Sequence, residues 1–188
     1  MSALRIVPLL LALGLVAGGC ASTSTRATGM LAADAPRALA TAGPVSVAWN
    51  DPATFKEIRY SVNRCEAARG GWLTDLAEYL RNQAERRLAP GERLDLTIVD
   101  VDRAGDFEPG RDVNLYDTRI LRDIYPPRMT VQFRHYGAGG AVIAEGERKL
   151  TDLAHLTGIN PTSSTDALRY EKRMIDTWLR RELATASR

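Results

Sequence analysis

The stretch that decides the fold is residues 129–150, MTVQFRHYGAGGAVIAEGERKL. Its first half alternates the apolar residues Met129, Val131 and Phe133 with polar ones, which is the pattern of a strand with one buried and one solvated face. The glycine-rich residues 137–140 then lead into a second strand over 141–150. A short turn of this kind between two strands predicts an antiparallel hairpin.

Three further segments upstream of the hairpin have strand patterns. Residues 94–101, LDLTIVDV, place Leu94, Leu96 and Ile98 on one face and Val99 and Val101 on the other. A strand that is apolar on both faces is expected at the centre of a sheet. Residues 45–49, VSVAW, predict a short half-buried strand, and residues 118–124 contain one more strand-like piece.

Two helices complete the predicted elements. Apolar residues recur at helical spacing over residues 72–88 and again over residues 166–183. Residues 53–71 carry mixed signals and close with two glycines, so we expect a loop there. The order of elements predicts an α+β fold, with a mainly antiparallel sheet of about four to five strands and both helices packed on one face.

The first twenty residues, MSALRIVPLLLALGLVAGGC, predict export. Arg5 precedes an apolar run that is too short to span a bilayer and ends in small residues, which is typical of a secretory signal. Residues 16–20, VAGGC, resemble the lipobox of bacterial lipoproteins, although Ala17 stands where leucine is commonest. The resemblance implies that Cys20 is acylated as the mature N-terminus, and that Ala21 directs sorting to the outer membrane. The alternative is ordinary signal cleavage, which leaves a soluble periplasmic protein.

The domain organisation follows from composition. We expect a lipoprotein-type signal over residues 1–19, a flexible tether over 20–43 and a single domain over 44–185. The tether is rich in alanine, serine, threonine and glycine and has no apolar period, so it cannot bury enough surface to fold. Removing the signal removes one of the 25 basic residues, so basic residues then exceed the 23 acidic ones by one. This near-neutral balance argues against nucleic-acid binding.

An acidic segment, DVDRAGD over residues 100–106, is the most suggestive polar cluster. Several carboxylates converging from a tight loop suit a hard cation such as calcium. Ala104 and Arg111, however, stand where such a loop needs oxygen ligands, so we favour a strand end with solvated carboxylates and expect no metal site. The weak candidates for ligand binding, from this segment and from residues 123–128, are Asp100, Asp102, Asp106, Asp123 and Arg128.

No residue pattern predicts catalysis or a cofactor. His135 continues the apolar face of residues 129–133, so we expect a hydrogen-bonded histidine at the edge of the core. His155 could join Asp152 and Ser163 or Ser164 in a Ser-His-Asp arrangement, but no nucleophile elbow or oxyanion motif accompanies it.

Tryptophans and the second cysteine also have structural interpretations. We expect Trp49, Trp72 and Trp178 to anchor the core, whereas a cell-wall-binding module would need them exposed in a groove. Cys65 has no intrachain partner if Cys20 is acylated, and we expect it to be a partly buried free thiol.

Four ordered segments are similar to those of one protein family. They are residues 100–109 (DVDRAGDFEP), 123–133 (DIYPPRMTVQF), 146–153 (GERKLTDL) and 168–183 (LRYEKRMIDTWLRREL). Together they resemble the DUF3016 family, exported proteobacterial proteins, many of them lipoproteins, with no assigned function. The resemblance covers residues 44 to 184 and implies no catalytic or binding residue.

These observations favour a non-catalytic lipoprotein of the cell envelope. We expect it to be anchored through Cys20 at the periplasmic face of the outer membrane and to contact an envelope protein partner of unknown identity. The alternative is a periplasmic hydrolase or a small-ligand or cation-binding protein that uses the acidic loop 100–106 and the segment 123–128.

Overall fold

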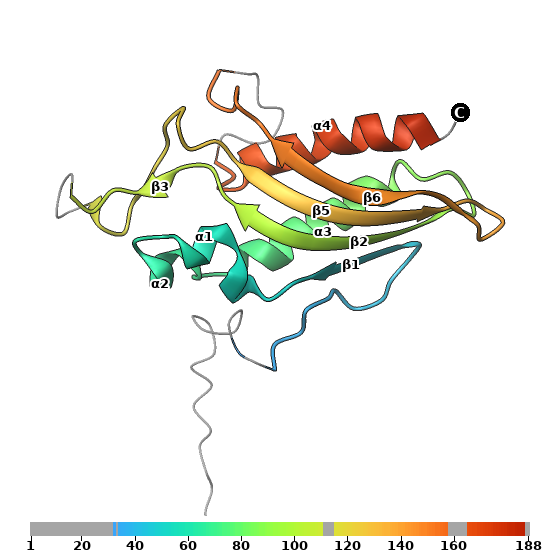
Figure 1. The fold of residues 1–188 in the computed structure, drawn as a ribbon, viewed down its shortest axis with the longest axis horizontal. Coiled ribbons are helices and arrows are strands. Elements are labelled where there is room, and N and C mark those ends of the chain that lie inside the picture. Colours follow the sequence, from blue (N-terminus) through green and yellow to red (C-terminus); the bar gives the residue numbers. More distant parts are fainter. Residues whose placement is uncertain (1–31, 33, 111–114, 158–164, 187–188) are drawn as a thin grey trace, which may run out of the picture.

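A mixed four-stranded sheet forms the centre of the molecule in this computed structural model, which describes residues 32, 34–110, 115–157 and 165–186. Its strands, in spatial order, are β1 (Val45–Trp49), β2 (Arg93–Asp102), β5 (Arg128–Tyr136) and β6 (Val142–Thr151). β1 and β2 are parallel, whereas β2 with β5 and β5 with β6 are antiparallel. The predicted hairpin is therefore confirmed, and the strand predicted over 94–101 is central (Figure 1).

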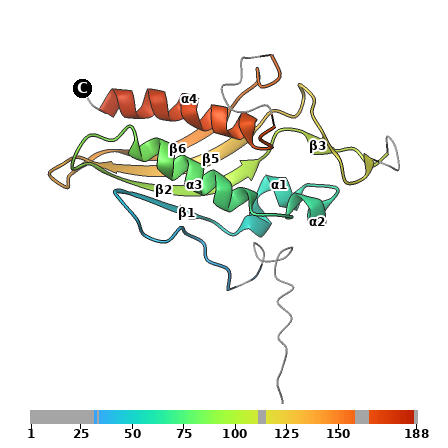
Figure 2. The same ribbon diagram turned by 180° about the vertical axis from the view of Figure 1, so that it is seen from behind.

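Two helices, α3 (Trp72–Glu85) and α4 (Arg169–Ala186), cover one face of this sheet (Figure 2). The apolar stripe predicted for the first of them is buried, with Leu73, Leu76, Leu80 and Ala84 at most 1% exposed. The α3 helix ends before the predicted Leu88, and the Leu88 amide still bonds to the carbonyl of Ala84. The opposite face of the sheet carries polar side chains. The α+β fold with both helices on one face is confirmed.

A β-bulge near the end of β2 changes which of its side chains point into the core. Ile98 pairs with Val131 and Asp100 pairs with Thr130, so the extra residue is Val99. An extra residue reverses the alternation of side chains beyond it. Val101 therefore lies in the core, fully buried. The expectation that Val101 faces away from Ile98 is wrong, because strict alternation does not anticipate an inserted residue.

The segment over residues 53–71, expected to be a loop, contains short helices. They are η1 (Pro52–Thr54), α1 (Lys56–Arg59) and α2 (Arg64–Ala67). Each has three or four residues, which is too few to produce an apolar period. Their capping residues carry the local signal, since the side chains of Asp51 and Asn63 accept hydrogen bonds from backbone amides at the start of η1 and α2.

A small arm projects beyond the carboxyl end of β2. It consists of β3 (Asp106–Phe107) and β4 (Arg119–Ile120), which pair antiparallel. The strand-like piece predicted over 118–124 is thus reduced to two residues. Gly105, with a φ of +80°, turns the chain from β2 into the arm.

The outer edge of β1 is closed by residues 37–40, which belong to the predicted tether. The Leu39 amide donates to the carbonyl of Val47 at 2.9 Å, and the Trp49 amide donates to the carbonyl of Arg37 at 2.8 Å. Leu39 also packs against the core. These contacts attach the end of the tether to the sheet.

The predicted signal over residues 1–19 and Cys20 lie outside the described residues. Among the helices of the described part, none has the length and hydropathy needed to cross a membrane.

Candidate functional site

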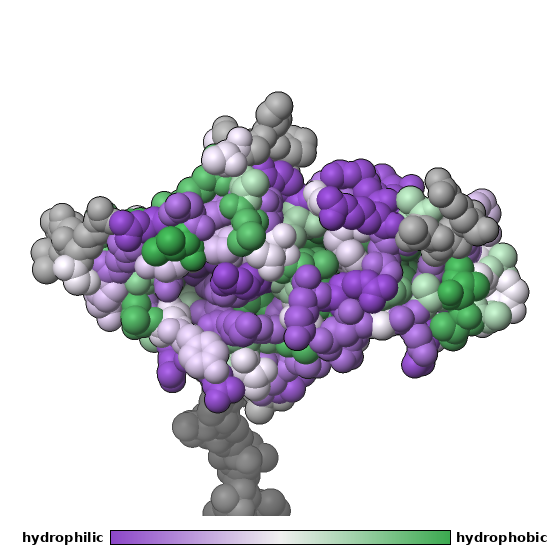
Figure 3. Space-filling view, turned by 45° about the horizontal axis from the view of Figure 1, so that its top comes forward, coloured by the Kyte–Doolittle hydropathy of each residue, from purple (hydrophilic) through white to green (hydrophobic). Residues whose placement is uncertain are grey.

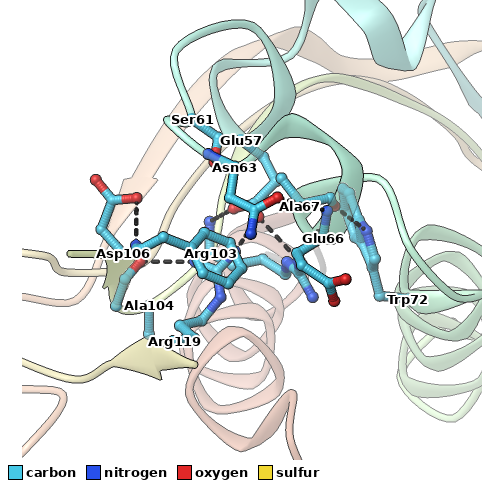
Figure 4. A network of polar contacts seen from close by, with 12 residues as sticks. Glu57, Ser61, Asn63, Glu66, Ala67, Trp72, Arg103, Ala104, Asp106 and Arg119 are labelled. Carbon is cyan, nitrogen blue, oxygen red and sulfur yellow. Dashed lines mark hydrogen bonds and ion pairs between the residues drawn. The ribbon is translucent and has the colours of Figure 1, made fainter. Parts of the chain in front are cut away.

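A buried carboxylate, Glu57, gathers two arginines at the carboxyl end of β2 (Figure 4). Its side chain is 2% exposed. Oε1 accepts from Nη2 of Arg103 at 2.8 Å and also from Nη2 of Arg119, while Oε2 accepts from the backbone amide of Arg103 at 2.8 Å. Both carboxylate oxygens therefore already have donors from within the chain.

Arg103 is held from several sides. Its Nη2 also donates to the carbonyl of Ala67 at 3.2 Å, and its guanidinium lies 4.6 Å from the ring centre of Trp72. The indole of Trp72 donates to the same carbonyl at 3.0 Å. The α2–α3 connection, Trp72 and Glu57 thus fix one guanidinium in a mostly buried position.

Arg119 connects the arm to this site. Its Nη1 donates to the carbonyl of Gly105 at 2.7 Å, and its guanidinium lies 4.8 Å from the ring centre of Phe107. Burial lowers the pKa of Arg119, although the neighbouring Glu57 opposes that shift. Because an arginine pKa begins so high, the group stays charged and compensates Glu57.

A second buried carboxylate, Glu171, reaches the same region from the first turn of α4. It is 1% exposed, and its Oε1 accepts from the amide of Ala104 at 2.7 Å. Its Oε2 has no hydrogen-bond partner among the described residues. Burial raises the pKa of Glu171. Burial, followed by the negative charge of Glu57, also raises the pKa of Asp102.

The geometry of this network favours a structural role over a catalytic or ligand-binding one. A general base or a ligand site needs an oxygen or nitrogen that a substrate can reach, and both oxygens of Glu57 are occupied. The arginines bridge segments that are distant in sequence, namely α1, the end of β2 and the arm. The network therefore holds these segments together at one end of the sheet.

Of the five candidate ligand-binding residues, the structure brings Asp102 and Arg128 together as an ion pair, whereas Asp100, Asp106 and Asp123 each bond elsewhere. Asp100 accepts from the amide of Lys56 at 2.8 Å, and Asp102 accepts from Arg128 at 3.4 Å. Asp106 and Asp123 each accept from the amide of the next residue, in two separate turns. Across the described residues, no group of three or more His, Cys, Asp or Glu side chains is placed to hold a metal ion.

Both histidines are 1% exposed. His135 has its Nε2 3.0 Å from Oε2 of Glu92, which confirms the expected hydrogen-bonded histidine. His155 packs edge-on against Tyr170 with ring centres 5.4 Å apart, and neither ring nitrogen has a partner in the described ranges. Asp152 binds Arg173 at 2.6 Å, while Ser163 and Ser164 lie outside the described residues.

The three tryptophans are buried in the core, as predicted, and none is more than 8% exposed. A groove of exposed tryptophans, which a cell-wall-binding module needs, is therefore absent from the described structure. Cys65 lies on α2 and is exposed, so the expected partial burial of its thiol is wrong. A helix of four residues turns this side chain to solvent while its neighbour Ala67 enters the core.

The outer edge of β6 is an exposed edge of the sheet. In the described ranges no strand pairs with this edge, and most side chains of β6 are exposed. A groove of about 890 Å³ lies between the end of β6 and α4. Leu150, Met174 and Trp178 line it together with cationic side chains such as Lys149 and Arg180.

Sequence patterns missed the buried network. Glu57, Arg103 and Arg119 lie in segments without a period that separates buried from exposed positions. Glu171 did carry a signal, because it follows Leu168 by three residues and precedes Ile175 by four, which places it on the apolar stripe of α4.

The class is thus an α+β domain in which two helices cover a mixed sheet and buried arginine–carboxylate contacts close one end. The family described as "Protein of unknown function (DUF3016)" matches residues 43–181, and the chain belongs to this family. Comparisons with curated proteins and with solved structures give no match.

Proposed function

We propose that this protein is a non-catalytic lipoprotein of the cell envelope, anchored through acylated Cys20 at the periplasmic face of the outer membrane. Its domain acts through contacts with other protein chains. The anchoring part rests on the signal-like residues 1–19 and the VAGGC segment that ends at Cys20. The protein-contact part rests on the exposed edge of β6.

A strand edge presents backbone N–H and C=O groups that bind an extended chain by adding it to the sheet. The two edges of this sheet differ. Residues 37–40 cover β1, whereas the described part of the chain places no strand beside β6. The groove beside the end of β6 adds an apolar floor, so an added strand gains side-chain contacts as well as backbone hydrogen bonds.

The buried polar groups support a structural role over a catalytic one. The buried Glu57 has donors on both oxygens, and its arginines are stacked on aromatic rings. The aspartates of residues 100–106 each bond within the chain. The charged side chains that a reaction would require are therefore already paired within the chain.

Two experiments test the proposal. Mass spectrometry of the mature protein is expected to find an acylated N-terminal Cys20, and Cys20→Ala is expected to move the protein from the membrane fraction to the soluble one. An unmodified mature N-terminus beyond Cys20 overturns the anchor.

For protein contact, a photo-crosslinking amino acid at Lys149 on β6 is compared in cells with one at Arg69, an exposed position that follows α2. We expect protein adducts from position 149 and none from position 69. An absence of adducts from position 149 overturns the protein-contact function.

A further inference from the structure

We infer that β6 pairs with β6 of a second copy of this chain, antiparallel, so that two sheets join into one. This inference rests on the proposed function, because it names one partner for the same edge. Its basis is the order of charged, small and apolar side chains along Val142–Thr151.

The two faces of β6 are assigned by its pairing with β5. Glu145, Glu147 and Lys149 lie opposite Arg134, Gln132 and Thr130, on the polar face of the sheet. The intervening residues Ala144, Gly146, Arg148 and Leu150 lie on the face that the helices cover. In a continuous sheet of two copies, the two polar faces lie on one side and the two helix-covered faces on the other. A residue of one copy therefore pairs only with a residue on the same face of the second copy.

One register of the two β6 strands pairs opposite charges on the polar face. With residue 148 at the two-fold axis, Glu147 lies opposite Lys149 of the second copy, and Lys149 lies opposite Glu147. The same register places Glu145 opposite Thr151. Opposite charges across strands stabilise a pair, whereas like charges destabilise it.

The neighbouring registers fail this criterion. Moving the axis to residue 147 places Glu145 opposite Lys149 but also places Glu147 opposite itself, and moving it to residue 149 places Lys149 opposite itself. Each of these registers brings two like charges face to face at the axis. On the polar face, the alignment with residue 148 at the axis is therefore the one of these three that pairs opposite charges and places no like charges opposite each other.

The helix-covered face also fits at the axis. The Arg148 guanidinium lies 4.9 Å from the ring centre of Phe133 and makes hydrogen bonds of 2.8 and 2.9 Å to Glu182. In this register Arg148 lies opposite Arg148 of the second copy, but each guanidinium is paired with Glu182 of its own chain and directed over its own sheet, away from the edge. In the same register Leu150 lies opposite Gly146, so a large side chain meets a residue with no side chain.

Apolar residues at the two ends of β6 complete the match. Val142 and Ile143 are 47% and 45% exposed at one end, and Leu153 is 75% exposed just beyond the other. Antiparallel pairing brings Val142 and Ile143 of one copy close to the groove at the end of β6 in the second copy. Figure 3 shows hydrophobic surface toward both ends of the molecule and mostly hydrophilic surface between them.

The test is a charge swap in the full chain in detergent micelles, with mass measured by light scattering after size-exclusion chromatography. The wild type is expected to be dimeric. Glu147→Lys and Lys149→Glu each create two like-charge contacts at the axis and are expected to weaken dimerisation by about ten-fold or more. The double variant Glu147→Lys/Lys149→Glu restores both pairs and is expected to dimerise again.

Arg69→Glu, which changes an exposed charge away from the edge, is the matched control and is expected to stay dimeric. Circular dichroism verifies that each variant is folded. A monomeric wild type, or a double variant as weak as the single ones, overturns the inference. In that case adducts of a different protein at position 149 leave the proposed function standing, and an absence of adducts overturns both.

Discussion

The backbone amide of Ala104 donates a hydrogen bond of 2.7 Å to Oε1 of Glu171, and this contact joins the end of β2 to the first turn of α4. Charged carboxylates are rarely buried so completely without a cation in direct contact, because burial disfavours the charged form. The raised pKa of Glu171 expresses this cost. The burial of Glu171, which the Ala104 hydrogen bond only partly offsets, therefore makes the stability of the domain depend on pH.

We expect Glu171→Gln to reduce that dependence. The folded protein binds a proton at Glu171 more tightly than the unfolded chain does. Protonated Glu171 therefore stabilises the fold fully at pH values below the pKa of the unfolded chain. This stabilisation is lost as the pH rises through the raised pKa of the folded state. Glutamine keeps an oxygen for the Ala104 amide and carries no charge at any pH. Urea unfolding at several pH values is expected to show that the free energy of unfolding of the variant rises relative to that of the wild type as pH increases. A constant difference between the two proteins at all pH values contradicts this account.

Glu57→Gln is expected to destabilise the domain by about 3 kcal/mol, because it leaves the guanidinium groups of Arg103 and Arg119 buried without a counter-charge. Chemical denaturation measures the change. Glu145→Gln is the matched control, since Glu145 and its partner Arg134 are both more than half exposed. An exposed pair is screened by solvent, so this substitution is expected to have a much smaller effect. Equal effects of the two substitutions would show that Glu57 does not act through buried charge.

The sequence predicts the sheet and the helices because their patterns repeat. Alternation over residues 129–136 and helical spacing over residues 72–85 each place many apolar side chains on one side, so single exceptions do not obscure the period. The Glu57 network has no such repetition. Its partners Arg103 and Arg119 follow Glu57 by 46 and 62 residues, and only the folded chain brings them together.

Local irregularities limit the rest of the prediction. The bulge at Val99 depends on how β2 pairs with β5, and the short helices over residues 52–67 depend on single capping side chains. The acidic residues 100–106 illustrate the consequence for sites. Their spacing suggests convergence, but a strand end followed by the turn at Gly105 sends Asp102 and Asp106 to different partners.

That turn provides a third prediction. Gly105 has a φ of +80°, and a Cβ added there would lie 2.7 Å from the carbonyl oxygen of Ile120. Gly105→Ala is therefore expected to cost roughly 1–3 kcal/mol and to loosen the pairing of β3 with β4. Gly139→Ala is the control, because a Cβ at Gly139 meets nothing within 4 Å, and a change within about 0.5 kcal/mol is expected there. Denaturation midpoints that fall equally for both variants would contradict the steric explanation.

The attachment of residues 37–40 to β1 gives the last prediction. The Leu39 and Trp49 amides donate hydrogen bonds of 2.9 and 2.8 Å across the β1 edge, so both are expected to exchange slowly with deuterium. The amide of Asp34 precedes this contact and is expected to exchange fast. Leu39→Pro removes the donor to Val47 and is expected to speed exchange at Trp49 while leaving the central strand β2 protected. If Trp49 stays equally protected in that variant, the edge of β1 is closed by something other than this segment, and the tether would then be free up to the start of the sheet.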